Sequence, residues 1–447
     1  MVTPAFTHDA AGTPAEAWSR PERDALSLLE IDRYRHLVVV AAHPDDESLG
    51  AGGLVATAAA RGQRITLVLA TAGEGSHPRS PTHTPGMLAA VRRAEADAAL
   101  AQLAPGARLV FLGQQDGSVA DGEDALVAAL VDEIGLAGAD TLVVAPWRGD
   151  GHPDHEAAGR AAAAAARRTD ARLVEYPIWW WHWGTPEEAP WHLLRRLPLA
   201  PEARRRRDRA VAAHRSQVRP LSVAPGDEAL LSERVLAHFR GGSEHFVVDS
   251  VTDDRLDRLH RAEPDPWGTD RRWYEERKRR LVLASLPRRR YARILDLGCS
   301  TGALTADLAT RLTPDGHLLA LDASQAAVDA ARERLASADE HRVGIRRGEI
   351  PRDLPDGPFD LVALSEVGYF LSPRDLDGLR ERVADLVDPE GTVLLCHWRH
   401  PIVGWPLDGP QVHRAFEDAF PLPVQARYRD RDVELLILSA DESWPAP

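Results

Sequence analysis

Short apolar runs alternate along the chain with longer stretches that have the polar and apolar spacing of helices. In the first part, apolar runs predict buried strands at residues 37–42, 64–71, 107–113, 140–146 and 171–178. The stretches between them, such as 88–104 and 156–168, are rich in alanine and carry polar faces, which is typical of helices. Buried strands that alternate with helices predict a parallel sheet covered on both faces.

A second strand–helix series begins near residue 293. Between about residues 185 and 264 the rhythm of strands breaks, proline and arginine become frequent, and only helices are indicated. Apolar runs then return at residues 293–297, 318–324, 359–366, 391–398 and 433–439. The pattern therefore predicts an α/β protein with two tandem Rossmann-like domains of mainly parallel sheet. We expect boundaries at 1–253 and 254–447, with a helical lid at about 262–290 opening the second domain.

Composition narrows the class of protein. The 447 residues carry 68 acidic and 54 basic side chains, a formal charge of -14, which argues against a nucleic-acid partner. The first residues do not form a signal peptide, and no apolar run is long enough for a membrane span. Two cysteines are too few for a disulfide framework. We expect a cytoplasmic protein with no membrane partner, and composition leaves open whether it forms a homo-oligomer.

Two polar clusters follow strands of the first domain. The run AHPDDE places His43, Asp45 and Asp46 after the first strand, and HPDH places His152 and His155 after the strand at 140–146. Two histidines and one carboxylate suit hydrolytic zinc, although the same ligands also serve non-haem iron. Asp45, beside a ligand, could take a proton from a metal-bound water. Either cluster alone is more typical of a loop or a helix cap, and their occurrence together favours the metal site.

These motifs resemble the PIG-L/LmbE-type zinc N-deacetylases over about residues 35–250. The resemblance extends to the runs at 71–74 and 92–95 and to the turn LGQQDG. It implies an LmbE-like fold and removal of acetyl groups from N-acetylglucosamine-type sugars. The implied zinc ligands are His43, Asp46 and His155, with Asp45 as general base and a protonated His152 that stabilises the oxyanion or assists departure of the amine. The implied sugar contacts are Arg92, Asp116 and Asp150.

Five residues, Trp179 to Trp183, read WWWHW. Aromatic faces stack on sugar rings, so this segment could form a platform in the site. Tryptophans also pack in cores and interfaces, and the sequence leaves both interpretations open.

A glycine-rich turn marks the second domain. The run DLGCSTG places Asp296, Gly298 and Gly302 between a strand and a helix, where small residues let a ligand approach the backbone. Asp322 follows 24 residues after Gly298 and is positioned to bind ribose hydroxyls. The spacing does not match G-x-G-x-x-G, which argues against NAD. A glycine turn in a fold without a nucleotide is the alternative.

This pattern resembles class I S-adenosylmethionine (SAM) methyltransferases over about residues 262–447. The resemblance implies a SAM site formed by Asp296, Gly298, Cys299, Gly302, Asp322, Ala323, Glu349 and Ser365. Residues 265–280, 365–371 and 397–401 are similar to nodulation-type (NodS-like) N-methyltransferases, which methylate the free amine of a deacetylated chito-oligosaccharide. That similarity implies a lid with Trp273 and Tyr274 and an acceptor pocket with Glu366, Tyr369, His397 and Arg399. Glu366 and His397 are the candidates for taking the proton of the amine.

The two resemblances share one chemical logic, because a deacetylase exposes an amine and an N-methyltransferase consumes one. The resulting hypothesis is a bifunctional enzyme that uses zinc to deacetylate an acetamido sugar or sugar conjugate and SAM to methylate the freed amine. The alternative is a deacetylase of a non-sugar N-acyl natural product fused to an O- or C-methyltransferase.

Overall fold

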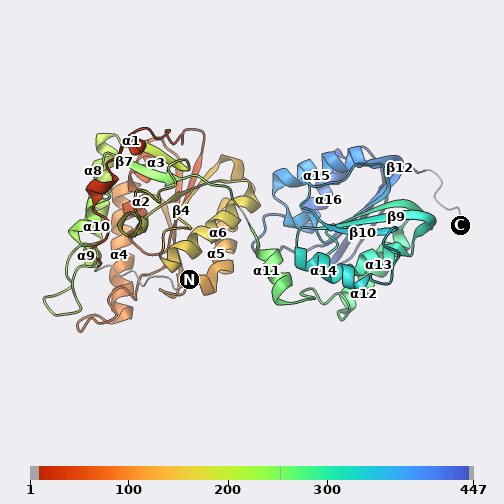
Figure 1. The fold of residues 1–447 in the computed structure, drawn as a ribbon, viewed down its shortest axis with the longest axis horizontal. Helices are drawn as coiled ribbons and strands as arrows, with labels where there is room; N and C mark the ends of the chain where they lie inside the picture. Colours follow the sequence, from red (N-terminus) through yellow and green to blue (C-terminus); the bar gives the residue numbers. More distant parts are fainter. Residues whose placement is uncertain (1–9, 252, 442–447) are drawn as a thin grey trace. The chain divides into compact units, whose positions relative to one another are not determined.

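The computed structural model describes residues 10–251 and 253–441. The chain folds as two compact units, residues 1–252 and 253–447. Each unit contains one seven-stranded, mostly parallel sheet with helices on both faces (Figure 1). The predicted α/β class with two tandem domains of mainly parallel sheet is therefore confirmed.

The first sheet has the strand order β3-β2-β1-β4-β5-β7-β6. Strands β1 to β5 pair in parallel, whereas β7 is antiparallel to both of its neighbours. The strands are β1 (His36–Ala41), β2 (Arg64–Thr71), β3 (Arg108–Gln114), β4 (Thr141–Pro146), β5 (Arg172–Tyr176), β6 (Leu194–Pro198) and β7 (Ser243–Val247). All six residues of β1 and of β4 are buried, as expected for central strands with helices on both sides.

Helices cover both faces of this sheet. Helices α3, α4 and α8 share one hydrophobic core with Leu37 and Val39 of β1, and α5 and α6 share another with Val38 and Val40. The helices are α1 (Pro21–Asp24), α2 (Asp46–Gly50), α3 (Gly52–Ala60), α4 (Pro85–Leu103), α5 (Glu123–Ile134), α6 (Pro153–Thr169), α7 (Trp180–Trp183), α8 (Pro201–Ala213), α9 (Arg215–Val218) and α10 (Glu233–Ala237). Because successive residues of β1 point to opposite faces, one strand contributes to both cores.

The second sheet has the order β10-β9-β8-β11-β12-β14-β13. Its strands are β8 (Tyr291–Leu297), β9 (Leu312–Asp322), β10 (Val343–Arg347), β11 (Phe359–Ser365), β12 (Val387–Trp398), β13 (Val424–Arg429) and β14 (Val433–Ser439). Strand β14 is antiparallel to both neighbours, and the other pairs are parallel. The helices are α11 (Arg255–Ala262), α12 (Trp273–Ser285), α13 (Ala303–Ala309), α14 (Gln325–Arg334), α15 (Pro373–Leu386) and α16 (Gly409–Ala419).

Four strands were not among the predicted ones, namely β6, β7, β10 and β13. Three of them, β6, β10 and β13, lie at the edges of their sheets. Edge strands are covered on fewer sides, so they lack the continuous apolar run that marks β1 or β11. Strand β6 reads LRRLP and β13 reads VQARYR, each with half-exposed or exposed residues. The stretch at 185–264, expected to be helical only, therefore contains the two strands β6 and β7.

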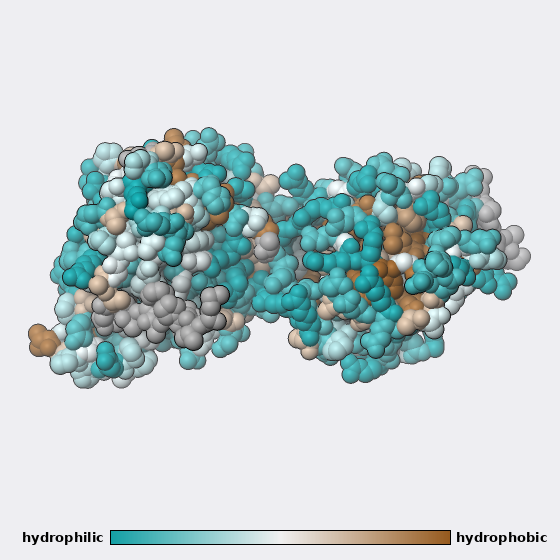
Figure 2. All heavy atoms as spheres, in the orientation of Figure 1, coloured by the Kyte–Doolittle hydropathy of each residue, from teal (hydrophilic) through white to brown (hydrophobic). Residues whose placement is uncertain are grey.

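Hydrophilic residues cover most of the surface on the face shown in Figure 2. Within the part of the chain that the structure describes, no helix has the length and apolar character needed to cross a membrane.

Candidate functional sites

The first site lies where β1 and β4 end. His43 follows β1, Asp46 is the first residue of α2, and His155 lies in the first turn of α6, which follows β4. Strands β1 and β4 are parallel neighbours, so their carboxyl ends meet at one edge of the sheet. The fold therefore brings together the two motifs that are far apart in the sequence.

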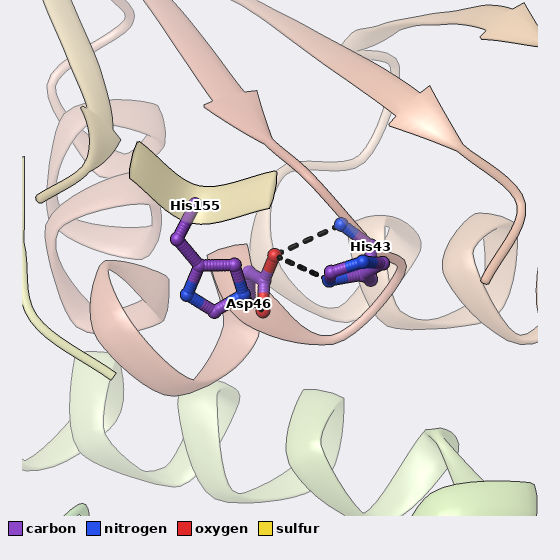
Figure 3. Close-up of side chains that lie close together, drawn as sticks. All are labelled: His43, Asp46 and His155. Atoms are coloured by element: carbon purple, nitrogen blue, oxygen red, sulfur yellow. Dashed lines mark hydrogen bonds and ion pairs between the residues drawn. The ribbon is translucent and has the colours of Figure 1, made fainter. Parts of the chain in front are cut away.

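Figure 3 shows His43, Asp46 and His155 around one point. Asp46 Oδ2 accepts a hydrogen bond from the backbone N–H of His43 at 2.9 Å and lies 3.6 Å from His43 Nδ1. Asp46 Oδ1 lies 3.2 Å from His155 Nε2. One ligand atom of each residue lies within 4.8 Å of the others, and all three residues are buried. The spacing suits a single metal ion.

Asp150 orients the ring of His155. Asp150 Oδ2 lies 2.7 Å from His155 Nδ1, which leaves Nε2 facing Asp46. That Nε2 atom is buried and has no hydrogen-bond partner of ordinary geometry among the described residues. Burial opposes a charge on His155, but Asp46 and Asp150 raise its pKa to about 9, so a metal ion would displace a proton here. A histidine whose second ring nitrogen contacts a carboxylate is a typical zinc ligand, and the residues present fit zinc.

The position of Asp150 differs from the predicted sugar contact. Its side chain is 1% exposed and does not line the pocket. Its two oxygens accept hydrogen bonds from the backbone N–H groups of residues 178, 179 and 180 in addition to the contact with His155. The carboxylate therefore acts behind the ligand set, where a sugar cannot reach it.

Asp45 lies beside the ligands and lines the pocket, as the general-base prediction requires. Its backbone has φ 134°, which is rare for a residue other than glycine. Burial, opposed by the neighbouring Arg92, raises the pKa of Asp45 to about 6. A carboxyl group with a pKa near neutrality can exchange a proton at working pH.

Arg92 is 3% exposed and fixes the loop around Asp45. Its guanidinium donates to the carbonyl oxygens of Gly73 and Pro44 at 2.9 and 2.6 Å and lies 3.2 Å from Asp45 Oδ1. Arg92 also lines the pocket, so the predicted sugar contact is sterically open, but three protein oxygens already surround the guanidinium.

His152 lines the same pocket, and the structure favours its neutral form. Burial, together with the neighbouring His155 and His43, lowers the pKa of His152 to about 3. Its Nδ1 accepts a hydrogen bond from the backbone N–H of Asp154 at 3.3 Å, so the proton of the neutral ring lies on Nε2. The protonated His152 implied by the resemblance is therefore not the form that this environment favours. The neutral ring still offers one N–H donor.

Two carboxylates contact Nε2 of the His43 ring, the nitrogen that does not face Asp46. His43 Nε2 lies 3.0 Å from Asp116 Oδ1 and 3.1 Å from Asp154 Oδ2. Burial opposes a charge on His43, but hydrogen bonds with Asp116, Asp154 and Asp46 raise its pKa well above 6.5. Asp154 was not a predicted site residue, although it lies inside the HPDH motif. Its carboxylate also accepts hydrogen bonds from the backbone N–H groups of residues 117 and 119, which ties the turn containing Asp116 to α6.

The pocket over this site has a volume of about 410 Å³. Trp179 and Trp183 line it, and their rings stack at 5.1 Å between centroids. Trp180 and Trp181 instead pack against Trp18, at 4.8 and 5.0 Å. Trp180 and Trp181 therefore pack as core residues do, whereas Trp179 and Trp183 lie where an aromatic platform would have to be, and the sugar platform stays a prediction.

The second site lies at the turn between β8 and α13. Gly298 and Gly302 have φ values of 74° and 77°, a region that favours glycine. A Cβ atom at Gly298 would lie 2.5 Å from a side-chain carbon of Val367. Thr305 donates to Asp296 at 2.7 Å, and burial raises the pKa of Asp296 to about 6. Glycine is therefore required at this turn by the backbone conformation and, at Gly298, also by the packing against Val367.

The residues of this turn fit SAM. Asp296, Gly298, Cys299 and Ser300 line a second pocket of about 410 Å³. The hydroxyl of Ser300 is buried and has no hydrogen-bond partner among the described residues. Asp322 accepts hydrogen bonds from the backbone N–H groups of residues 300 and 324, both at 2.9 Å, which ties the end of β9 to the same turn.

The predicted acceptor residues divide between this pocket and its surroundings. Glu366 and Tyr369 line the pocket, as does Ser365 of the predicted SAM site. His397 does not; it is fully buried, and its Nε2 accepts a hydrogen bond from the backbone N–H of Gly368 at 3.1 Å. Burial, together with Lys278, lowers the pKa of His397 to about 3, so this ring is neutral. The geometry therefore does not bring His397 to the acceptor.

Six further predicted residues also lie outside the lining of the pocket, namely Gly302 and Asp322 of the predicted SAM site, Trp273 of the predicted lid, Arg399, Glu349 and Ala323. The guanidinium of Arg399 donates to the backbone carbonyl oxygen of Asp430. Glu349 lies 3.4 Å from Arg352 in a largely exposed ion pair. Ala323 is exposed after β9. By contrast, the pocket is lined by Tyr274, Glu275, Lys278 and Trp398, of which only Tyr274 was predicted, and then as part of the lid. Residues on α12 were hard to predict because their charges are typical of any exposed helix face.

Two family models match the chain. The model described as PIG-L, GlcNAc-PI de-N-acetylase, matches residues 38–166, and a methyltransferase domain model matches residues 294–391. Each match covers the strands and motif loops of one site.

Known proteins resemble each part separately. A 1D-myo-inositol 2-acetamido-2-deoxy-alpha-D-glucopyranoside deacetylase of Tsukamurella paurometabola is 28% identical over 299 residues, which cover 53% of this chain and 97% of that protein. Carboxy-S-adenosyl-L-methionine synthase of Chromohalobacter salexigens is 38% identical over 106 residues, 23% of this chain, and the match spans only 39% of its length. The crystal structure of the N-methyltransferase NodS of Bradyrhizobium japonicum is 22% identical, with a TM-score of 0.37, over 42% of this chain and 98% of that chain.

Proposed function

Because the chain joins a PIG-L deacetylase domain to a class I SAM-dependent methyltransferase domain, we propose that it works as a bifunctional enzyme. The first site removes the acetyl group of an acetamido sugar or sugar conjugate, and the second methylates the freed amine. The observation that carries the deacetylase assignment is the buried Nε2 of His155, which faces Asp46 and lacks a hydrogen-bond partner among the described residues.

In the first site, different side chains would bind the metal, transfer the proton and stabilise the oxyanion. His43, Asp46 and His155 would hold zinc, which would supply Lewis acidity toward water and the amide carbonyl. Asp45 takes the proton of the attacking water and passes it to the departing amine. His152 donates its Nε2 proton as a hydrogen bond to the developing oxyanion.

The pocket over this site supports an amino-sugar substrate. The stacked pair Trp179 and Trp183 offers an aromatic wall against which the apolar face of a sugar ring can lie. The relative from Tsukamurella acts, by its name, on an acetamido-deoxyglucopyranoside. A sugar with an N-acetyl group therefore suits both the wall and the zinc-binding residues.

In the second site, the pocket supports an amine acceptor. The carboxylates of Glu275 and Glu366 line it beside the turn that would hold SAM. When bound, SAM supplies an electrophilic methyl group. Methyl transfer then depends on alignment and on removal of a proton from the amine. A carboxylate in the pocket can take that proton, which favours an amine over a hydroxyl or carbon acceptor.

The experiment separates the two reactions. Zinc-loaded protein is incubated with a panel of N-acetyl amino sugars, and release of free amine is measured with and without a chelator. In parallel, incorporation of radiolabelled methyl from SAM is measured with the corresponding free amines. We expect chelator-sensitive amine release and methyl incorporation at nitrogen. Methyl incorporation at oxygen or carbon would contradict the proposal and favour the O- or C-methyltransferase alternative.

A further inference from the structure

The acceptor pocket contains a buried cation between two carboxylates. Lys278 of α12 is 4% exposed, and its Nζ lies 2.8 Å from Glu275 Oε2 and 3.2 Å from Glu366 Oε1. All three residues line the pocket. The two carboxylates are not equivalent, however, because they differ in how many of their lone pairs are already used.

The carboxylate of Glu366 is fully occupied. Its Oε1 faces the hydroxyl of Tyr274 at 2.9 Å and the ammonium of Lys278 at 3.2 Å. Its Oε2 accepts hydrogen bonds from the hydroxyl of Tyr369 and from the backbone N–H of Trp398 at 3.3 Å. An ionised carboxylate offers about four lone-pair positions, and four donors are present. Glu366 therefore has no lone pair left for a proton from a substrate amine.

The contacts of Glu366 indicate a positioning role. Two of its donors, Tyr274 and Lys278, belong to α12, whereas Glu366 itself follows β11. Its backbone φ is 57°, a strained value for a residue other than glycine. The hydrogen bonds hold this strained residue and fasten the helix over the end of the strand.

In Glu275, only one of the two carboxylate oxygens has a partner among the described residues. Its Oε2 faces Lys278, and its Oε1 accepts no hydrogen bond among the residues that the structure describes. The side chain is 13% exposed and lines the pocket. Lys278 holds one oxygen of this carboxylate, and because the residue lines the pocket, the other oxygen is available to an acceptor bound there.

From this geometry we infer that Glu275 is the residue that binds the acceptor ammonium and takes its proton. The inference rests on the proposed N-methylation. One N–H bond of the ammonium breaks and the proton passes to Glu275 Oε1, leaving a neutral amine. The nitrogen lone pair then forms the bond to the methyl carbon, and the electron pair of the broken carbon–sulfur bond stays on sulfur. Glu366 and Lys278 act as positioning residues.

The lining aromatic residues support a cationic ligand. Tyr274 and Trp398 lie 5.0 Å apart at nearly a right angle, and both line the pocket. Aromatic faces attract an ammonium group within about 6 Å. The ammonium of Lys278 already lies over the Tyr274 ring, 5.1 Å from its centre. The ring of Trp398 and the second oxygen of Glu275 therefore favour the same ligand, a protonated amine.

Three full-length variants test the assignment, E275Q, E366Q and the matched control E276Q. Glu276 is on the same helix and pairs with Arg280 at the surface. Methylation of a free amino sugar is measured across pH, with KM and kcat determined separately. We expect E275Q to lower kcat/KM by about 100-fold or more near neutral pH, with a raised KM and partial recovery at alkaline pH where the amine is already neutral. E366Q should lower thermal stability and kcat without changing the shape of the pH profile, and E276Q should match wild type.

A binding measurement keeps this test independent of turnover. Glucosamine and N-acetylglucosamine are titrated calorimetrically into protein saturated with S-adenosylhomocysteine. We expect wild-type and E276Q protein to bind glucosamine more tightly than N-acetylglucosamine. In E275Q the ratio of these two affinities should fall at least tenfold. The assignment is overturned if wild type shows no preference, if E275Q keeps it, or if E366Q rather than E275Q changes the pH profile. Failure of amine methylation in wild type, with the binding preference intact, would contradict the proposed reaction and leave the ammonium site standing.

Discussion

The geometry of the candidate metal site depends on residues outside its set of possible ligands. The carboxylate of Asp150 contacts one imidazole nitrogen of His155 and accepts hydrogen bonds from three backbone N–H groups. It therefore fixes both the ring and the start of α7. Losing a carboxylate behind a histidine ligand typically weakens metal affinity about 10- to 100-fold.

We therefore expect Asp150→Asn to lower zinc affinity by that factor, because an amide cannot accept from His155 and the backbone on both of its polar atoms. A competition titration against a chelator measures the change. The exposed Asp132 provides the control, and D132N should bind zinc like wild type. Equal affinity in D150N and wild type would show that Asp150 does not orient the ligand.

At this scale, the sequence predicted residues that belong to compact motifs and missed residues that act through the fold. The ligand candidates His43, Asp46 and His155 converge as their spacing and strand positions suggested. The role of Asp150 could not be predicted because, apart from His155, its partners are backbone N–H groups of residues 178–180, which are distant in sequence. Glu275 and Lys278 could not be distinguished from other charges on α12, because an amphipathic helix shows its charge pattern but not which charges a neighbouring strand will bury.

At the scale of elements, Glu244 of β7 connects this strand of the first sheet to α3. Its oxygens accept hydrogen bonds from the backbone N–H groups of Gly53 and Leu54, at 2.6 and 2.8 Å. These groups lie in the first turn of α3, where they have no partner within the helix. Burial, opposed by these bonds and by Arg207, raises the pKa of Glu244 to about 7.

This shift predicts a pH dependence of stability. Between pH 4.5 and about 7 the folded carboxyl keeps a proton that the unfolded one releases, so the free energy of unfolding falls as the pH rises through this window. The total loss is about 3 kcal/mol. Glu244→Gln cannot ionise and should lack this fall. Urea denaturation across the window, followed by tryptophan fluorescence, measures the slope, with the exposed Glu22→Gln as control. A slope in E244Q as steep as that in wild type would contradict the prediction.

The same scale shows which elements a sequence pattern can predict. Central strands such as β1 and β11 carry continuous buried runs, and the periodicity identified them. Edge strands such as β6 and β13 mix charged and apolar residues, because one side faces no neighbouring strand. Their antiparallel pairing with β7 and β14 depends on contacts distant in sequence, which local pattern does not encode.

At the scale of the whole molecule, the two sites lie in separate compact units, each with its own sheet and pocket. If the two sites work independently, a substitution in one site should abolish its own activity and leave the other activity unchanged. Asp45→Asn should lower deacetylation by at least about 100-fold, because the proton acceptor for water is lost. The same variant should methylate a free amine at the wild-type rate. Parallel assays on one preparation measure both rates, and a simultaneous loss would contradict independent sites.

The central claim is that the product of the first site is the substrate of the second. The most direct measurement is mass spectrometry of an N-acetyl amino sugar after incubation with zinc-loaded protein, with and without SAM. The account predicts loss of an acetyl mass without SAM and the additional gain of a methyl mass on nitrogen with SAM. It also predicts neither change in D45N. Methylation of the substrate while its acetyl group is still in place, or deacetylation that never leads to a methylated amine, would contradict the account.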